Sequence, residues 1–176
     1  MDWQGSKLGN YQVEYLLGSG AFADVYLGKH IYLNTSAAIK ILQTRLGEND
    51  LQSFLEEARA VANLIHPNII RVLEFGVEGQ TPYLIMDYAP AGTLRQLHPR
   101  PARLTVSECV TYMNQIAAAL QYAHDHRVIR RDVKPENILI GPHEQLLLSD
   151  FGIAVAAQSS RYQAQQEFGG TAAYSD

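Results

Sequence analysis

The segment Asp132-Val133-Lys134-Pro135-Glu136-Asn137 brings together side chains that suit one kind of chemistry. An apolar run follows it, and a further acid, Asp150, stands at the end of the next apolar run. Transfer of a phosphoryl group to a hydroxyl needs a proton acceptor, oxygen ligands for Mg²⁺, and cations near the phosphates. Asp132 can accept the proton, and Lys134 supplies a cation. Asn137 and Asp150 offer the hard oxygen ligands that Mg²⁺ prefers. The segment therefore indicates phosphoryl transfer.

A glycine-rich run, Gly18-Ser19-Gly20-Ala21-Phe22-Ala23, lies between two stretches of β-type composition. By itself the run is weak evidence, because glycine turns between strands are common. It does not open a helix, as a dinucleotide-binding loop does, and it lacks the Gly-Lys-Ser/Thr ending of a P-loop. It is typical of a strand–turn–strand flap whose backbone N–H groups can close over phosphates. Val25, just beyond the flap, could pack on an adenine ring.

A lysine in an apolar strand is the third candidate, at Ala38-Ile39-Lys40. An ammonium group in such a strand is costly to bury unless an anion meets it. Glu57, in the following predicted helix, can supply one carboxylate, and phosphates can supply the rest. The alternative is a lysine on the solvent-exposed face of an edge strand, and Lys40 alone does not decide between the two.

Hydrophobic periodicity predicts the elements that position these residues. The helix over 51–65 carries an apolar face, and the helix after Thr105 begins with the capping-box pattern Thr105-Val106-Ser107-Glu108. Its apolar stripe runs from Val106 to Ala123 and includes Met113, and we expect Cys109 to be a small core residue. Strands are predicted at 11–16, 22–31, 37–42, 69–75, 83–86, 138–140 and 146–148, with a connecting region at 90–101. The pattern predicts an α+β fold, and the connecting region marks the expected boundary between a β-rich first lobe and a helical second lobe.

The composition limits the possible classes of protein. Its hydrophobic fraction of 47% and charged fraction of 18% indicate a folded chain rather than a disordered one. A formal net charge of −4 gives no reason to expect nucleic acid as a partner. One cysteine excludes an intrachain disulfide. Neither a signal peptide nor an apolar run long enough to cross a membrane is visible, so we expect a cytoplasmic protein.

Taken together, these motifs resemble those of the bacterial branch of the eukaryotic-type Ser/Thr protein kinases. The resemblance extends from about Tyr11 to Tyr174. It includes the glycine-rich run, Ala38-Ile39-Lys40, Glu57, His66-Pro67-Asn68-Ile69, Met86-Asp87-Tyr88-Ala89, residues 132–137, Asp150-Phe151-Gly152 and Gly170-Thr171-Ala172-Ala173-Tyr174. It implies an N-terminal tail over 1–10 and a kinase domain over 11–176. Within that domain the N-lobe spans 11–89 and a partial C-lobe spans 90–176.

The same resemblance implies a role for each candidate residue. Lys40 would hold the α- and β-phosphates of ATP and pair with Glu57. Asp132 would orient the attacking hydroxyl of a protein Ser or Thr, and Lys134 would contact the γ-phosphate. Asn137 and Asp150 would hold Mg²⁺, and Met86 would lie behind the adenine. The residues implied to contact ATP are Leu17, Gly18, Ser19, Gly20, Ala21, Phe22, Ala23, Val25, Ala38, Lys40, Met86, Asp87 and Ala89.

Three features depart from the family pattern. Ala23 replaces the third glycine of the loop, which we expect to stiffen it slightly. Arg130 stands where the family has a histidine before Arg131 and Asp132, and we expect this change to reduce activity. The chain ends at Asp176, before the helices that in the family cover the stripe around Met113 and Leu120. The sequence therefore predicts a truncated domain with an exposed helix face that a partner could cover.

The departures keep alternatives to an active kinase open. The chain can be a catalytically weak or silent ATP-binding fragment that acts as a binding module, or a gene remnant that does not fold. Ser159, Ser160 and Thr171 are candidate phosphorylation sites, although Thr171 is favoured for positioning substrate.

Overall fold

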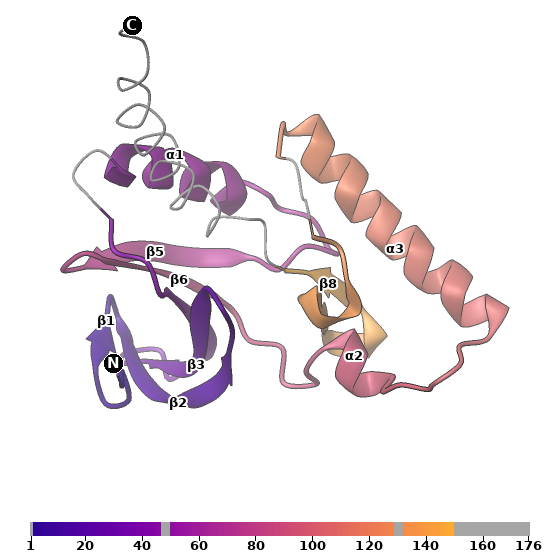
Figure 1. Ribbon diagram of the computed structural model, residues 1–176, viewed down its shortest axis with the longest axis horizontal. Coiled ribbons are helices and arrows are strands. Elements are labelled where there is room, and N and C mark those ends of the chain that lie inside the picture. The colour runs from indigo at the N-terminus through magenta and orange to yellow at the C-terminus, as the bar shows by residue number, and fades with distance from the viewer. Residues whose placement is uncertain (1, 47–49, 129–131, 150–176) are drawn as a thin grey trace, which may run out of the picture.

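The computed structural model describes residues 2–46, 50–128 and 132–149. They form a β-rich lobe with one long helix and a second lobe built around another helix (Figure 1). Of the predicted site residues, Asp150 lies outside the described ranges. The same holds for Arg130, Arg131, Ser159, Ser160 and Thr171.

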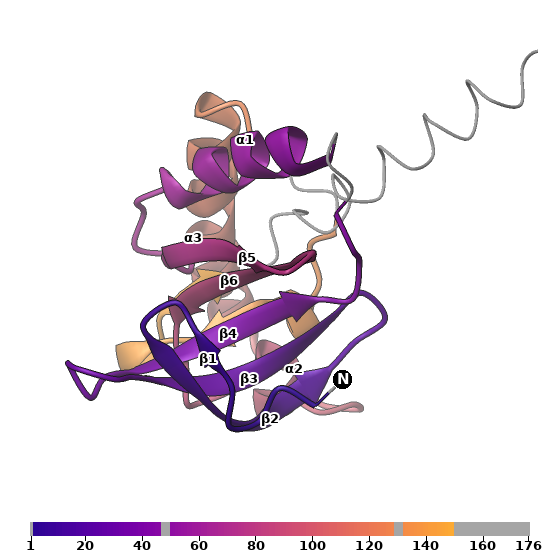
Figure 2. The same cartoon turned by 90° about the vertical axis from the view of Figure 1, so that its left-hand side faces the viewer.

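A six-stranded antiparallel sheet forms the first lobe, in the order β1-β2-β3-β4-β6-β5. The strands are β1 (Lys7–Leu8), β2 (Tyr11–Ser19), β3 (Ala23–His30), β4 (Ser36–Leu42), β5 (Val72–Glu78) and β6 (Thr81–Asp87). Figure 2 shows the β1–β4 part of the sheet curled beside β5 and β6. The segment 1–10, expected to be a tail, contributes β1, and its Leu8 is buried in the sheet's own hydrophobic cluster.

Side-chain alternation along β4 separates two faces of the sheet. Ile39 and Ile41 are buried in a cluster formed within the curled sheet. Ala38 and Lys40 therefore point to the opposite face. Helix α1 (Asp50–Ala62) covers that face, because its Phe54 and the sheet's Leu42 and Leu84 belong to one buried cluster. The helix predicted over 51–65 ends earlier in the structure, at Ala62.

The second lobe contains α2 (Leu94–Leu97), α3 (Val106–Asp125), two 3-10 turns, η1 (Pro135–Asn137) and η2 (Pro142–Glu144), and the hairpin of β7 (Ile138–Ile140) and β8 (Leu146–Leu148). The capping box at the start of α3 is confirmed. Thr105 Oγ1 accepts a hydrogen bond from the Glu108 N–H, and Glu108 Oε2 accepts one from the Thr105 N–H. Ile116, Ala119 and Ala123 bury the inner face of α3 in the same cluster as Phe54.

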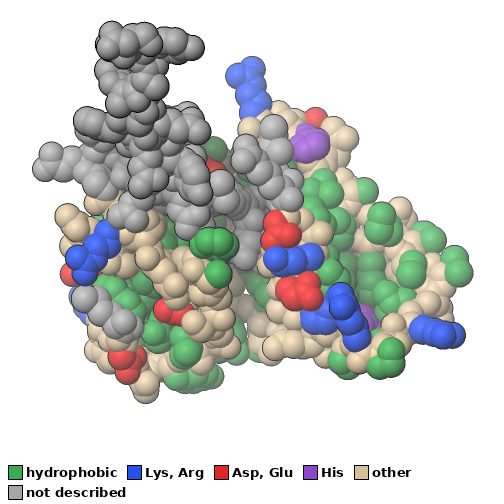
Figure 3. All heavy atoms as spheres, in the orientation of Figure 1, with side chains coloured by type: hydrophobic (Ala, Val, Ile, Leu, Met, Phe, Trp, Pro, Cys, Tyr) green, Lys and Arg blue, Asp and Glu red, His purple; other side chains and the backbone are tan. Residues whose placement is uncertain are grey.

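The predicted apolar stripe lies on the outer face of α3, where part of it is exposed to solvent. Met113 is 66% exposed and Val106 is 81% exposed, and Figure 3 shows hydrophobic side chains spread over this side of the molecule. Leu120, in contrast, packs against the core. The prediction that Cys109 is a core residue is wrong: it is exposed, because it lies on the outer side of the first turns.

Candidate active site

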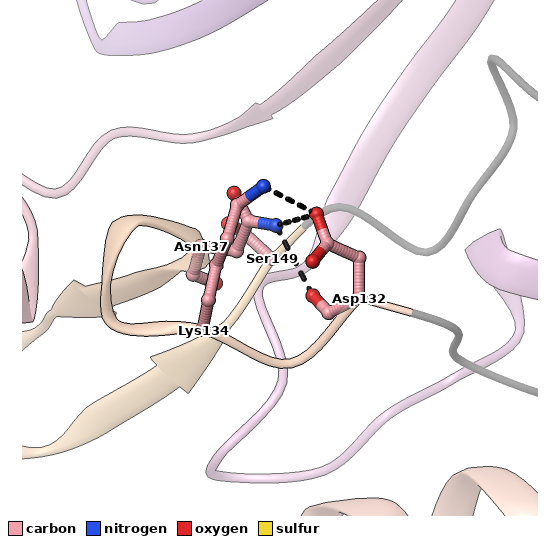
Figure 4. Close-up of polar contacts among 4 residues, drawn as sticks. All are labelled: Asp132, Lys134, Asn137 and Ser149. Atoms are coloured by element: carbon pink, nitrogen blue, oxygen red, sulfur yellow. Dashed lines mark hydrogen bonds and ion pairs between the residues drawn. The ribbon is translucent and has the colours of Figure 1, made fainter.

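Asp132, Lys134 and Asn137 meet in one loop that precedes β7 (Figure 4). Lys134 Nζ lies 2.5 Å from Asp132 Oδ2. Asn137 Nδ2 donates to the same carboxylate oxygen at 3.1 Å and to the Asp132 carbonyl at 3.1 Å. The Asp132 side chain is 61% exposed. Its carboxylate is therefore held from within the chain, while most of the side chain is accessible to solvent.

Local sequence explains why this loop folds back on itself. Pro135 stands at the first position of η1, where its fixed φ favours the turn and its missing N–H costs nothing. The Asn137 N–H then donates to the Lys134 carbonyl at 2.9 Å. This single turn brings the Asn137 amide over Asp132.

The two hydrogen bonds donated by Asn137 Nδ2 fix the orientation of its amide. Its Oδ1 atom is consequently turned away from Asp132 and is an acceptor suited to a hard cation. Within the described ranges no group of three His, Cys, Asp or Glu side chains could hold a metal ion. A site with few protein ligands is what Mg²⁺ commonly uses together with phosphate oxygens. Asn137 Oδ1 is therefore suited to be one of the few protein ligands of Mg²⁺, and the metal site itself stays a prediction.

Ser149, at the end of β8, is attached to the same turn. Its backbone N–H and its Oγ both donate to the Asn137 carbonyl, at 3.0 Å and 2.9 Å. Ser149 is buried and directly precedes Asp150 in the sequence. The strand that leads to Asp150 is thus fixed beside Asn137. Sequence reasoning missed this role of Ser149, since a lone serine at a strand end carries no specific signal.

The glycine-rich run forms the tip of the β2–β3 hairpin, as predicted. Ser19 pairs with Asp24 across the hairpin, and Ser19 Oγ donates to Asp24 Oδ1 at 2.5 Å. A Cβ on Gly18 would meet no atom within 4 Å, and one on Gly20 would meet only the Ala23 carbonyl, at 3.5 Å. Among the described residues, close packing therefore does not explain why a glycine stands at either position.

Four other predicted nucleotide contacts share one face of the sheet. Val25 on β3 pairs with Lys40 on β4, and Ala38 on β4 pairs with Met86 on β6. Directly paired residues point to the same side, and so do residues two apart along a strand. Val25, Lys40, Ala38 and Met86 therefore lie together. The alternative of a lysine on an edge strand is wrong, because β4 is an internal strand between β3 and β6. Lys40 is also half-buried.

Glu57 lies on α1, the helix that covers this face. Phe54 and Val61, three residues before it and four after it, are both buried against the sheet. Glu57 consequently lies on the sheet-facing side of α1 and is half-buried. The structure brings the elements of Lys40 and Glu57 together, and their direct ion pair stays a prediction.

The segment after β6 connects the two lobes. The Asp87 N–H donates to the Arg71 carbonyl at 3.0 Å, and the Ala89 carbonyl accepts from Gly92 at 3.2 Å. Within the described ranges the Ala89 N–H makes no backbone hydrogen bond.

An ion pair that the sequence did not reveal joins α2 to η1, the turn that contains Asn137. Arg95 Nε lies 2.9 Å from Glu136 Oε1. The hydrogen bond from Arg95 holds the pKa of the Glu136 carboxyl below its ordinary value, with a smaller contribution from Lys134. The partners are 41 residues apart, so no local pattern predicts their contact.

Residues 11–175 match the family described as the protein kinase domain. The chain belongs to the protein kinase domain family. Within it, this kinase chain is 35% identical over 154 residues to serine/threonine-protein kinase PrkC of Bacillus subtilis, covering 86% of the chain and 24% of PrkC. It is 32% identical over 173 residues to a probable serine/threonine-protein kinase of Clostridium acetobutylicum, covering 97% of the chain and 26% of that protein.

Among solved structures, this kinase chain resembles the crystal structure of the kinase domain of Mycobacterium tuberculosis PknI, determined as a point mutant. The TM-score is 0.75 at 31% sequence identity, over 85% of the chain and 62% of that structure. The predicted α+β kinase fold is confirmed. The chain spans about a quarter of the length of the curated relatives. Protein kinases as a family use ATP and Mg²⁺. Among the helices of the described ranges, none has the length and apolar character needed to cross a membrane.

Proposed function

We propose that this chain transfers the γ-phosphate of ATP to Ser and Thr hydroxyls of proteins. The observation that carries the proposal is the turn in which Asp132, Lys134 and Asn137 meet. It combines a proton acceptor, a cation and a metal-ligand oxygen within six residues, and hydrogen bonds fix their relative positions before any substrate binds.

The nucleotide would lie against the sheet face described above. Leu17, Val25, Ala38 and Met86 would surround the adenine, and the Ala89 N–H and the backbone at Asp87 would meet its polar edge. The residues from Gly18 to Ala23 would cover the phosphates, which gives a reason for two glycines that packing does not explain. Lys40 would hold the α- and β-phosphates, supported by Glu57.

The metal would be held by Asn137 Oδ1 and Asp150. When bound, Mg²⁺ neutralises charge on the phosphate oxygens. The contribution of this chain is the orientation of the Asn137 amide, which is set by Asp132, and the attachment of Asn137 to the end of β8 through Ser149.

Asp132 would accept a hydrogen bond from the attacking hydroxyl and orient its oxygen toward the γ-phosphorus. As the new O–P bond forms, the bond from the γ-phosphorus to the β-γ bridging oxygen breaks and ADP leaves. The hydroxyl proton passes to the Asp132 carboxylate. Lys134, which is paired with Asp132, would stabilise charge on the transferred group with its ammonium.

Transfer of labelled γ-phosphate from ATP to a library of Ser- and Thr-containing peptides, with Mg²⁺ present, tests the proposal. Lys40→Met should lower the rate by at least about a hundredfold, because a cation aimed at the phosphates is lost. Lys7→Met, which removes an exposed lysine from β1, is the matched control and should leave the rate unchanged. If ATP raises the unfolding temperature of the chain but no transfer occurs, the silent binding module is correct instead.

A further inference from the structure

Asn68, in the segment that joins α1 to β5, is the centre of a hydrogen-bonded cluster outside the site described so far. Its Nδ2 donates to Gln115 Oε1 on α3 at 2.8 Å and to the Leu146 carbonyl on β8 at 2.9 Å. The Leu146 N–H also donates to Gln115 Oε1, at 2.9 Å. All three bonds are partly buried. One side-chain oxygen of Gln115 thus joins two segments that are 78 residues apart.

The chemistry of the partners fixes the atoms involved. The Leu146 carbonyl can only accept, so the Asn68 atom facing it must be the amide nitrogen. The Leu146 N–H can only donate, so the Gln115 atom facing it must be the oxygen. Both amide orientations therefore follow from backbone groups. Among the described residues, Gln115 Nε2 makes no hydrogen bond, and the oxygen alone does the joining.

This cluster continues into the candidate active site. The Leu148 N–H donates to the Asn68 carbonyl at 2.9 Å, and the Leu148 carbonyl accepts from Ile70 at 3.0 Å. Ser149 follows and donates twice to the Asn137 carbonyl. Helix α3 lies beside β8, as Figure 1 shows. Hydrogen bonds from Gln115 to Asn68 and β8, the peptide link from Leu148 to Ser149, and the bonds from Ser149 to Asn137 therefore connect α3 to the candidate site.

We propose that Gln115 is a positioning residue for the metal-binding end of the site. By accepting from both Asn68 and Leu146, its oxygen fixes β8 relative to α3 and to the segment after α1. The fixed strand then holds Ser149 against Asn137 and so keeps the Asn137 amide in place. The consequence for nucleotide binding rests on the proposed function, whereas the joining of the three segments does not.

Two substitutions at Gln115 separate the oxygen from the rest of the side chain. Gln115→Glu keeps an acceptor oxygen at the same distance from the backbone, and two N–H groups face it. Gln115→Met keeps the length and the helix propensity but removes the acceptor. It leaves one N–H of the Asn68 amide and the Leu146 N–H without their acceptor in a partly buried position, while the hydrogen bond from Asn68 Nδ2 to the Leu146 carbonyl stays possible. Helical packing alone predicts that both variants behave alike.

The experiment measures the thermal unfolding midpoint and the affinity for a fluorescent ATP analogue, each with and without Mg²⁺. We expect Gln115→Met to lower the midpoint by about 5 °C and Gln115→Glu to keep it within about 1 °C. Gln115→Met should also weaken binding about fivefold with Mg²⁺, and Mg²⁺-free binding should change by less than about twofold. Equal midpoints for Gln115→Met and the unchanged chain overturn the proposal. So does a Glu variant as unstable as the Met variant, or a Met variant with undiminished Mg²⁺-dependent affinity.

A double substitution gives a second test of the bond shared by Asn68 and Gln115. Asn68→Ala removes the shared bond from the other side, so adding Gln115→Met to it should cost less than in the unchanged chain. Strict additivity of the two midpoint changes overturns the proposal. If the unchanged chain binds no nucleotide, the proposed function fails, and the midpoints still decide whether Gln115 joins the three segments.

Discussion

Asn137→Asp is the substitution that most sharply probes the turn in which Asp132, Lys134 and Asn137 meet. Asn137 Nδ2 donates to the Asp132 carboxylate and to the Asp132 carbonyl, both at 3.1 Å. An aspartate places a second negative oxygen where this donor stood. Two hydrogen bonds are lost, and two carboxylates then face each other across the turn.

The size of the effect follows from these distances. Each lost hydrogen bond costs about 1 kcal/mol, which gives about 2 kcal/mol for the pair. Two unit charges at this separation repel by about 1 kcal/mol in a water-like dielectric, appropriate because Asp132 is largely exposed. We therefore expect the free energy of unfolding to fall by about 3 kcal/mol at pH 7. Protonation removes these charges, so the part of the loss that comes from repulsion should disappear when the pH is lowered from 7 to 3.5.

Urea unfolding in Mg²⁺-free buffer at pH 7 and at pH 3.5 measures both parts. A loss of this size lowers the urea midpoint by roughly 1.5 M at pH 7. Asn114→Asp adds the same charge to the exposed side of α3 and is the control, with an expected change near zero. A midpoint for Asn137→Asp equal to that of the control would refute the orientation assigned to the Asn137 amide.

Two further predictions concern the packing around the site. Phe54 is fully buried where α1 covers the sheet, so Phe54→Ala should lower the free energy of unfolding by about 3–5 kcal/mol in urea; a loss below about 1 kcal/mol would contradict the packing of α1. The second prediction concerns Arg95, which lowers the pKa of Glu136 from its ordinary value of 4.5. The stabilisation by the Arg95–Glu136 ion pair is therefore present above pH 4.5 and is lost as the pH falls through the lowered pKa of Glu136. Arg95→Met should lower the unfolding midpoint at pH 7 and much less at pH 3, whereas equal losses at both pH values would show that the ion pair contributes nothing.

Features that depend on neighbours in the sequence could be predicted. The capping box of Thr105 and Glu108 needs only two side chains one helical turn apart. The turn η1 is likewise encoded locally, by Pro135 and the residues around it. The order of the strands from β2 to β8 and of helices α1 and α3 also followed from periodicity, which reports the local burial pattern, whereas β1 and α2 were not predicted.

Features that depend on tertiary contacts could not be predicted in the same way. Ile65 has helical spacing relative to Val61, yet it is 69% exposed because α1 has already ended at Ala62. Cys109 resembles a core residue by type, although the stripe it borders is exposed in the structure. The oxygen of Gln115 serves segments far away in the chain, and a glutamine on a helix gives no sign of this.

Replacement of Asp132 tests the central claim most directly. Asp132→Asn keeps the size of the side chain and removes the carboxylate that would orient the hydroxyl and accept its proton. Phosphate transfer to a Ser-containing peptide and binding of an ATP analogue are measured on the same preparation. We predict that transfer falls by about a hundredfold or more while affinity for the analogue changes by less than about threefold. Transfer at the rate of the unchanged chain would contradict the account.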